Sequence, residues 1–340
     1  MSEGLIGVIA GITGNSRRPK LRSPVAGAEA AVKHKPWLPA CESISQARNA
    51  IITVLLMMLV SGVAFGQARQ SAAPETVVIP SGVLKLKAFL WKPAGQGPFP
   101  AVLFNHGRSD DPQHQTRDRT ITATARILGP VFAKHGYVFL HPFRRGEGLS
   151  AGQGSFIGDL LQREELARGE EARKHLQFVL LTTDHLDDGM ASLFYLKSLP
   201  EVDSHRVAVA GHSFGGQITL LEAEQDPAVR AVVIFGAAAH SWSGSEEIRA
   251  SMLAAAAKIR VPILILHAAN DYSVAPGQAL DGELARLGKP HLLKIYPPVG
   301  ESANAGHNFL YTNISLWEDD VFRFLDDAPA TTPVRISLRP

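Results

Sequence analysis

A single serine stands between glycines in the stretch RVAVAGHSFGGQITLL, residues 206–221. Gly211, Ser213 and Gly215 form a G-x-S-x-G pentapeptide that follows an apolar run and precedes an apolar pattern of helical spacing. At so sharp a turn from a strand into a helix, the serine adopts a strained backbone conformation, and side chains at the two glycine positions would collide with their surroundings. The pattern therefore predicts that Ser213 is a nucleophile raised above the carboxyl edge of a sheet.

A serine hydroxyl needs a base to take its proton, and the base needs a carboxylate to orient it. In this strand–turn–helix context the chain order is serine, acid, histidine. Asp271 follows the apolar run PILILHAAN, and His307 lies in the glycine-containing segment PPVGESANAGHNFL. We predict a triad of Ser213, His307 and Asp271. The alternatives are a helix-cap or turn role for Asp271, a surface-loop role for His307, and Asp281 or Glu301 as the acid, although the positions of these two fit less well.

Attack on a carbonyl carbon places negative charge on its oxygen, which two preorganised N–H groups must stabilise. One donor is predicted to be the backbone amide of Phe214, which follows the nucleophile at a helix N-terminus. The other is predicted to be the amide of Arg108, since Gly107 lets that backbone approach closely. The side chain of Arg108 has two interpretations, binding of an anionic substrate group or a surface salt bridge. Trp242 likewise either lines the acyl pocket or packs in the core.

Eight apolar runs rich in Val, Ile and Leu alternate with helical patterns from residue 75 onward. The first two are predicted to form an antiparallel opening pair, and the continuous runs that follow suit strands buried on both faces of a parallel sheet. Helices are expected at roughly 117–135, 184–199, 214–225, 246–258, 275–288 and 313–327. The predicted fold is a three-layer α/β domain over 75–330, with an eight-stranded, mostly parallel sheet between helices.

One long connection, residues 151–182, opens with glycines and then becomes strongly charged. Glu164 with Arg168, and Glu170 with Lys174, have the i,i+4 spacing of helical ion pairs. Two interpretations stay open. The segment is either a solvated helix on the rim of the domain or a cap over the mouth of the pocket, since long insertions in such sheets often serve as lids.

The N-terminal segment, residues 1–66, is predicted to be an extension with a signal peptide. Its apolar run, 50–60, is shorter than the roughly 20 residues that a spanning helix needs. Ala64 and Gly66 have the small-residue spacing that signal peptidase reads, so cleavage is expected before Gln67. The expected location is secreted or periplasmic, with no stable membrane association after cleavage; an uncleaved anchor is the alternative.

Composition excludes several classes of function. Residues 1–66 hold seven Lys and Arg against three Asp and Glu, while the remainder holds 27 against 29, so no basic surface argues for nucleic acid. Cys41 is the only cysteine, which excludes disulfides and thiolate metal sites beyond it. The histidines lack metal-ligand spacing, and His106 and His267 are expected to bond backbone at strand ends. No dinucleotide or Walker motif is present, so neither metal nor cofactor is predicted.

The motifs NHGR, RRGEGLS, AGHSFGG, AANDYSVAP and AGHNF together resemble those of the α/β-hydrolase superfamily. The resemblance covers 75–327 and is closest to its dienelactone-hydrolase-like and prolyl-oligopeptidase-like branch. In that branch a turn similar to 144–152 shapes a loop, so we assign this segment no chemistry. Dienelactone hydrolases use cysteine as the nucleophile, whereas this chain has Ser213 in the matching place. The departure puts dienelactones in doubt as substrates and favours ordinary carboxylic esters.

The sequence thus predicts a serine hydrolase that cleaves a small carboxylic ester through an acyl-enzyme. Three alternatives remain open. They are a small peptidase or amidase with the same triad, an acyltransferase that diverts the acyl group to an added alcohol, and a catalytically silent binding protein with this fold. Fold alone does not fix the substrate, and the oligomeric state is left open.

Overall fold

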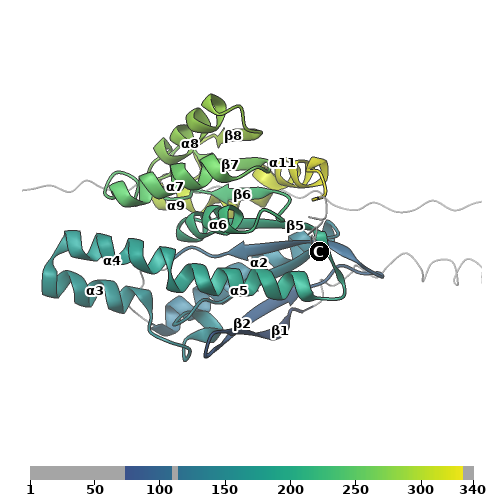
Figure 1. Cartoon of the computed structure of the whole chain (residues 1–340), viewed down its shortest axis with the longest axis horizontal. Helices are drawn as coiled ribbons and strands as arrows, with labels where there is room; N and C mark the ends of the chain where they lie inside the picture. The colour runs from purple at the N-terminus through teal and green to yellow at the C-terminus, as the bar shows by residue number, and fades with distance from the viewer. Residues whose placement is uncertain (1–72, 109–113, 332–340) are drawn as a thin grey trace, which may run out of the picture. The chain divides into compact units, whose positions relative to one another are not determined.

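One eight-stranded sheet runs through the part of the chain described by this computed structural model, residues 73–108 and 114–331 (Figure 1). Across the sheet the strands are β1 (Glu75–Ser81), β2 (Leu84–Trp91), β4 (Val138–Pro142), β3 (Phe99–Asn105), β5 (Val202–His212), β6 (Val232–Phe235), β7 (Ile263–Ala268) and β8 (His291–Tyr296). β2 pairs antiparallel with β1 and β4, and the other neighbours are parallel. The predicted sheet, with its antiparallel opening pair, is confirmed.

The connections between strands are mostly helical. In the described residues the helices are α2 (His114–Lys134), η2 (a 3-10 turn, Gly148–Ser150), α3 (Ile157–Arg168), α4 (Glu170–Thr182), α5 (Asp184–Ser198), α6 (Phe214–Gln225), α7 (Glu246–Lys258), α8 (Ala275–Arg286), α9 (Ala303–His307), α10 (Phe309–Thr312) and α11 (Ile314–Asp327). The six predicted helices correspond to α2, α5, α6, α7, α8 and α11. The short helices α9 and α10 were not expected, since one helical turn leaves no periodicity to read.

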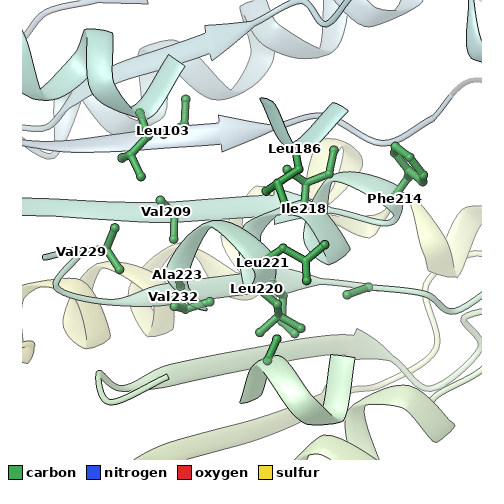
Figure 2. Packing of buried hydrophobic residues seen from close by; sticks show 14 of the residues in the cluster. Leu103, Leu186, Val209, Phe214, Ile218, Leu220, Leu221, Ala223, Val229 and Val232 are labelled. Carbon is green, nitrogen blue, oxygen red and sulfur yellow. The ribbon is translucent and has the colours of Figure 1, made fainter. Parts of the chain in front are cut away.

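The central strands separate two hydrophobic cores because successive side chains of a strand point to opposite faces. In β3, Leu103 belongs to the core under α5, α6, α7 and α8, and Val102 belongs to the core under α2 and α11. In β5, Val209 and Ala208 divide in the same way. Figure 2 shows part of the first core, which includes Leu103 of β3 and Val209 of β5 together with residues of α5 and α6. This division makes the domain three layers thick.

The charged insertion folds as two helices, α3 and α4, joined at Gly169 with φ +88°. They pack against each other, and α4 also contacts α5, α6 and α7 (Figure 1). None of the described helices is long and apolar enough to cross a membrane. The predicted signal peptide and its cleavage position before Gln67 lie outside the described residues.

Candidate active site

Ser213 lies where β5 turns into α6, with φ 54° and ψ −118°, a backbone conformation that L-residues rarely adopt. A Cβ on Gly211 would lie 2.5 Å from the carbonyl oxygen of Gly215. A Cβ on Gly215 would lie 2.1 Å from the carbonyl oxygen of Asn105, at the end of β3. Neither contact is sterically possible, so both positions require glycine. The strand–turn–helix context that the motif needs is therefore present.

Asp271 and His307 are in direct contact. Asp271 lies in the turn after β7, and Nδ1 of His307, the last residue of α9, donates to its Oδ1 over 2.7 Å. The backbone N–H of Tyr272 donates to the same oxygen over 2.7 Å. Burial acts to raise the pKa of Asp271, but hydrogen bonds from His267 and His307 outweigh it and lower that pKa to about 2. The ionised carboxylate keeps the proton of His307 on Nδ1, which leaves Nε2 able to accept one.

Ser213 and His307 line the same pocket, whose volume is about 890 Å³. The side chain of His212 joins their two segments, since its Nε2 donates to the backbone oxygen of His307 over 2.9 Å. Burial, followed by the nearby His307, lowers the pKa of His212 to about 3, so its ring is neutral at neutral pH. His212 thus ties the end of α9, which carries His307, to the end of β5, which Ser213 follows.

The two alternative acids lie elsewhere. Asp281 is on α8 and pairs with a histidine of β8 over 3.2 Å. Glu301 is exposed in the loop before α9. The predicted acid, Asp271, is therefore the one of the three that contacts His307.

The two residues whose backbone amides are the predicted oxyanion donors line the same pocket. Phe214 is the first residue of α6, and both it and Arg108 are among the residues that line the pocket. A Cβ on Gly107 would lie 3.0 Å from Nδ1 of His212 and 3.3 Å from Cβ of Ser213. Glycine at this position therefore lets the loop after β3 run close beside Ser213, the close approach that the sequence predicted.

Arg144 holds that loop from behind. Its guanidinium donates to the backbone oxygens of His106 and Gly107 over 2.7 and 3.2 Å. It also pairs with Glu147 over 3.0 Å, and Arg144 and Glu147 are 1 % and 0 % exposed. The guanidinium carbon lies 5.5 Å from the ring centroid of Phe214, so one buried cation contacts both segments that carry the predicted oxyanion donors. The sequence indicated only that this turn shapes a loop; the loop that it shapes is the one after β3.

Two predictions about histidines have different outcomes. Nδ1 of His106 lies 2.7 Å from the backbone oxygen of Gly107, as expected for a strand-end histidine. His267 was expected to bond backbone, and this prediction is wrong. Its Nδ1 lies 2.9 Å from Oδ2 of Asp271. The tight turn after β7 brings the carboxylate back over the ring four residues earlier, which apolar periodicity does not reveal.

Trp242 packs in the core and is not one of the described residues that line the pocket, so its predicted place in the acyl pocket is corrected. In the turns after β6, the backbone N–H of Trp242 donates to the backbone oxygen of Ala238 over 2.9 Å, and Trp242 is 8 % exposed. Its neighbours Ser241 and Ser243 line the pocket instead. The sequence places Trp242 in a loop beside the pocket, but it does not show whether the side chain points into the pocket or into the core.

The insertion contributes directly to the pocket. Four residues of α4 line it, namely Glu170, Arg173, Lys174 and Gln177. Nη1 of Arg108 lies 3.4 Å from Oε1 of Gln177, so α4 contacts the predicted oxyanion loop. The sequence marked this segment as a possible cap but identified none of its pocket residues. Within residues 73–108 and 114–331, no group of three or more His, Cys, Asp or Glu side chains could hold a metal ion.

Known proteins resemble this chain in sequence and in fold. The chain is 28% identical over 161 residues to the quorum-quenching protein AidA of Acinetobacter baumannii, a match that covers 47% of this chain and 43% of AidA. The chain therefore spans less than half the length of this relative.

Among solved structures, the dienelactone hydrolase of Anabaena variabilis is 19% identical, with a TM-score of 0.50, over 76% of this chain and 99% of that one. The acylaminoacyl peptidase of Pyrococcus horikoshii is 16% identical, with a TM-score of 0.53, over 82% of this chain and 46% of the peptidase. At these identities the two likenesses establish the α/β-hydrolase fold and nothing finer.

The sequence model of the dienelactone hydrolase family matches residues 132–320, which is more than half of the chain. The matched part begins in α2 and ends in α11, and it includes Ser213, Asp271 and His307 together with the α3–α4 insertion. Because this match covers more than half of the chain, and because the chain has the α/β-hydrolase fold, the chain belongs to the dienelactone hydrolase family.

Proposed function

We propose that this protein is a serine hydrolase that cleaves carboxylic esters through an acyl-enzyme. Oγ of Ser213 attacks the ester carbonyl carbon while Nε2 of His307 takes its proton, and Asp271 holds the imidazolium that forms. The amides of Phe214 and Arg108 stabilise the oxyanion. His307 then protonates the departing alcohol. Water, activated by the same histidine, releases the acid and restores the hydroxyl of Ser213.

One observation carries this proposal. His307, bonded to a buried, ionised carboxylate, lines the same pocket as a serine held at positive φ on a strand–helix turn. A base, its orienting acid and a strained nucleophile are the three parts that acyl transfer needs. A binding protein gains nothing from the strain at Ser213 or from burying the charge of Asp271, so their joint presence favours an enzyme over a silent binding protein.

The lining of the pocket favours small or polar esters over long acyl chains. Hydroxyl and amide side chains form much of its wall, among them those of Thr124, Gln177, Gln217 and Ser241. Burying an alkyl chain against unsatisfied polar groups costs free energy, because the groups lose water without gaining a hydrogen bond. We therefore expect the specificity constant to be highest for acetyl to butyryl esters and to fall as the chain lengthens.

The test is hydrolysis of a series of nitrophenyl esters by the wild type and by Ser213→Ala and His307→Ala. We expect turnover by the wild type and a fall of at least about 10⁴-fold in both variants. Equal, slow rates in all three proteins would contradict the proposal. Because the same triad chemistry cleaves amides and transfers acyl groups to alcohols, matched anilides and an added alcohol acceptor belong in the same assay. Faster anilide cleavage would identify a peptidase or amidase, and ester product with the alcohol would identify an acyltransferase.

A second candidate function comes from the relative in Acinetobacter baumannii, which is named a quorum-quenching protein. We propose that the same serine chemistry inactivates a quorum-sensing signal. A reporter strain grown in spent medium treated with the wild type would then respond less than one grown in medium treated with Ser213→Ala. Equal responses would remove this candidate without affecting ester cleavage.

We also propose that the protein is exported, with cleavage before Gln67. The support is the apolar run followed by small residues in the sequence, together with the absence of cysteine from residue 67 onward. N-terminal sequencing of the protein isolated from a periplasmic or culture-medium fraction tests this. A mature chain that begins at Met1 and remains in the cytoplasm would refute it.

A further inference from the structure

The carboxylate of Asp271 is held by two histidines, one on each oxygen. His307 contacts Oδ1 over 2.7 Å, and His267, near the end of β7, contacts Oδ2 over 2.9 Å. The side chains of Asp271 and His267 are 0 % and 1 % exposed, so bulk water cannot replace His267 as the donor to this carboxylate. Ester cleavage as proposed uses His307 and Asp271 but assigns His267 no part.

The surroundings make room for this second histidine. A Cβ on Gly277, in the first turn of α8, would lie 2.8 Å from Cδ2 and 2.9 Å from Nε2 of the His267 ring. A Cβ on Gly236, after β6, would lie 3.0 Å from Oδ2 of Asp271 and 3.0 Å from Nδ1 of His307. Glycine at both positions therefore leaves space for the two rings and for the carboxylate that they contact.

The protonation states follow from the hydrogen bonds. An ionised carboxylate only accepts, so both histidines must donate to it from Nδ1. A carboxylate that accepts on both oxygens cannot rotate about its Cβ–Cγ bond without breaking a buried, charge-assisted bond. The bond to His267 therefore fixes the direction in which Oδ1 faces His307.

We propose that His267 is a positioning residue for the reaction: it donates from Nδ1 to Oδ2 of Asp271 and thereby holds Oδ1 toward His307. This inference rests on the proposed ester hydrolysis. His267 touches neither substrate nor the attacking oxygen in this role. It acts through Asp271, whose Oδ1 accepts from His307 and from the backbone N–H of Tyr272 while Oδ2 faces His267.

Asparagine and leucine at position 267 make a matched pair, because they have nearly the same shape and only asparagine has an N–H donor on its γ-branch. In His267→Leu we expect kcat to fall about 10- to 100-fold with KM changed less than about threefold, the range found where a partner that orients a histidine at a metal site is removed. His267→Asn should keep kcat within about fivefold of the wild type. Thermal unfolding of both variants shows whether the two fold equally well.

The pH profile separates positioning from packing. The titratable groups that face His307 are Asp271, His212 and Tyr272, and those that face Asp271 are His267 and His307. Without the donor at 267, the carboxylate stabilises the protonated base more strongly. The acid limb of kcat/KM should therefore move to higher pH by about half a unit in His267→Leu, and not in His267→Asn. Equal losses of kcat in the two variants, with equal acid limbs, would mean that His267 only fills space and would overturn the proposal.

A readout that does not depend on turnover keeps this inference separate from the proposed function. In the Ser213→Ala background, the ring N–H of His307 bonded to Asp271 should give a far-downfield proton resonance. We expect that resonance to persist with Asn at 267 and to move or broaden with Leu. If the wild type cleaved no ester, the proposed function would fail, and this comparison would still decide the role of His267. An identical resonance in both variants would overturn it.

Discussion

Arg144 offers the strongest test of how the fold supports the predicted oxyanion loop. It is buried, donates to the backbone oxygens of His106 and Gly107, and pairs with Glu147 over 3.0 Å. Arg144→Met removes all of these contacts and leaves the carboxylate of Glu147 in the core without its partner guanidinium. Breaking one side of a buried ion pair costs about 3–5 kcal/mol. We expect a loss of that size in the free energy of unfolding, measured by urea denaturation followed by circular dichroism.

The double variant Arg144→Met/Glu147→Leu separates the stability of the pair from its effect on the loop. Removing the carboxylate as well abolishes the buried charge that has lost its guanidinium, so at least half of the lost free energy should return. The oxygens of His106 and Gly107 still lack the guanidinium, and of these two only the oxygen of Gly107 keeps a contact, with Nδ1 of His106, so the loop that carries the amide of Arg108 is held less firmly. We therefore expect kcat of the double variant to remain at least about tenfold below the wild type, since one oxyanion donor contributes 10²–10³ in kcat.

Three outcomes of this pair of variants would refute the reasoning. A loss below about 1 kcal/mol in Arg144→Met would mean that the buried pair is not a structural determinant. No recovery in the double variant would mean that packing, and not charge, sets the cost. Full recovery of kcat together with stability would mean that Arg144 does not position the oxyanion loop. Arg144→Lys, which keeps one donor and the charge, is the intermediate control.

Three further outcomes follow from the geometry of the site and the core. Ser213→Gly should be more stable than Ser213→Ala by about 1 kcal/mol in thermal unfolding, because glycine tolerates φ 54°; equal stabilities would contradict strain at the turn. Gly236→Ala should lower kcat about 10²-fold, because the added Cβ would lie 3.0 Å from both Asp271 and His307; unchanged ester turnover would refute this. Glu222 is a buried residue of α6, and burial raises its pKa to about 8. The free energy of unfolding should therefore fall between pH 5 and 8, and this fall should be absent from Glu222→Gln; parallel pH curves would contradict it.

The sign of the Glu222 effect depends on which state binds the proton. The folded protein keeps this carboxyl protonated to about pH 8, while the unfolded chain releases the proton near pH 4.5. The contribution is therefore complete below pH 4.5 and lost as pH rises through 8. Asp271 has the opposite sign. Its lowered pKa adds stability above about pH 4, and that stability is lost as pH falls toward 2.

Local patterns were enough to predict the sheet and the chain order of the candidate site residues, which is serine, then acid, then histidine. Continuous apolar runs predicted the strands, and the glycines around Ser213 predicted the turn, because both depend on steric limits that act over a few residues. Asp271 and His307 could be predicted because each follows a strand at the carboxyl edge of the sheet, where loops of a parallel sheet meet.

Contacts between distant segments could not be predicted in the same way. Arg144 contacts residues 106 and 107, and its role depends on how two loops fold over each other. His267 seemed a backbone partner because nothing in its apolar surroundings signals the return of Asp271. Trp242 follows a strand near the pocket, yet turns after β6 direct it into the core. The pocket residues of α4 depend on where the α3–α4 insertion packs, which its charge pattern does not state.

Labelling with a fluorophosphonate tests the central claim most directly, because this reagent reacts with a serine only where a base and oxyanion donors activate it. Intact mass followed by peptide mapping should show one phosphonyl group per chain, attached to Ser213. The same adduct should be absent from Ser213→Ala and should form far more slowly in His307→Ala. A label on another residue, or labelling of Ser213→Ala at the wild-type rate, would contradict the account.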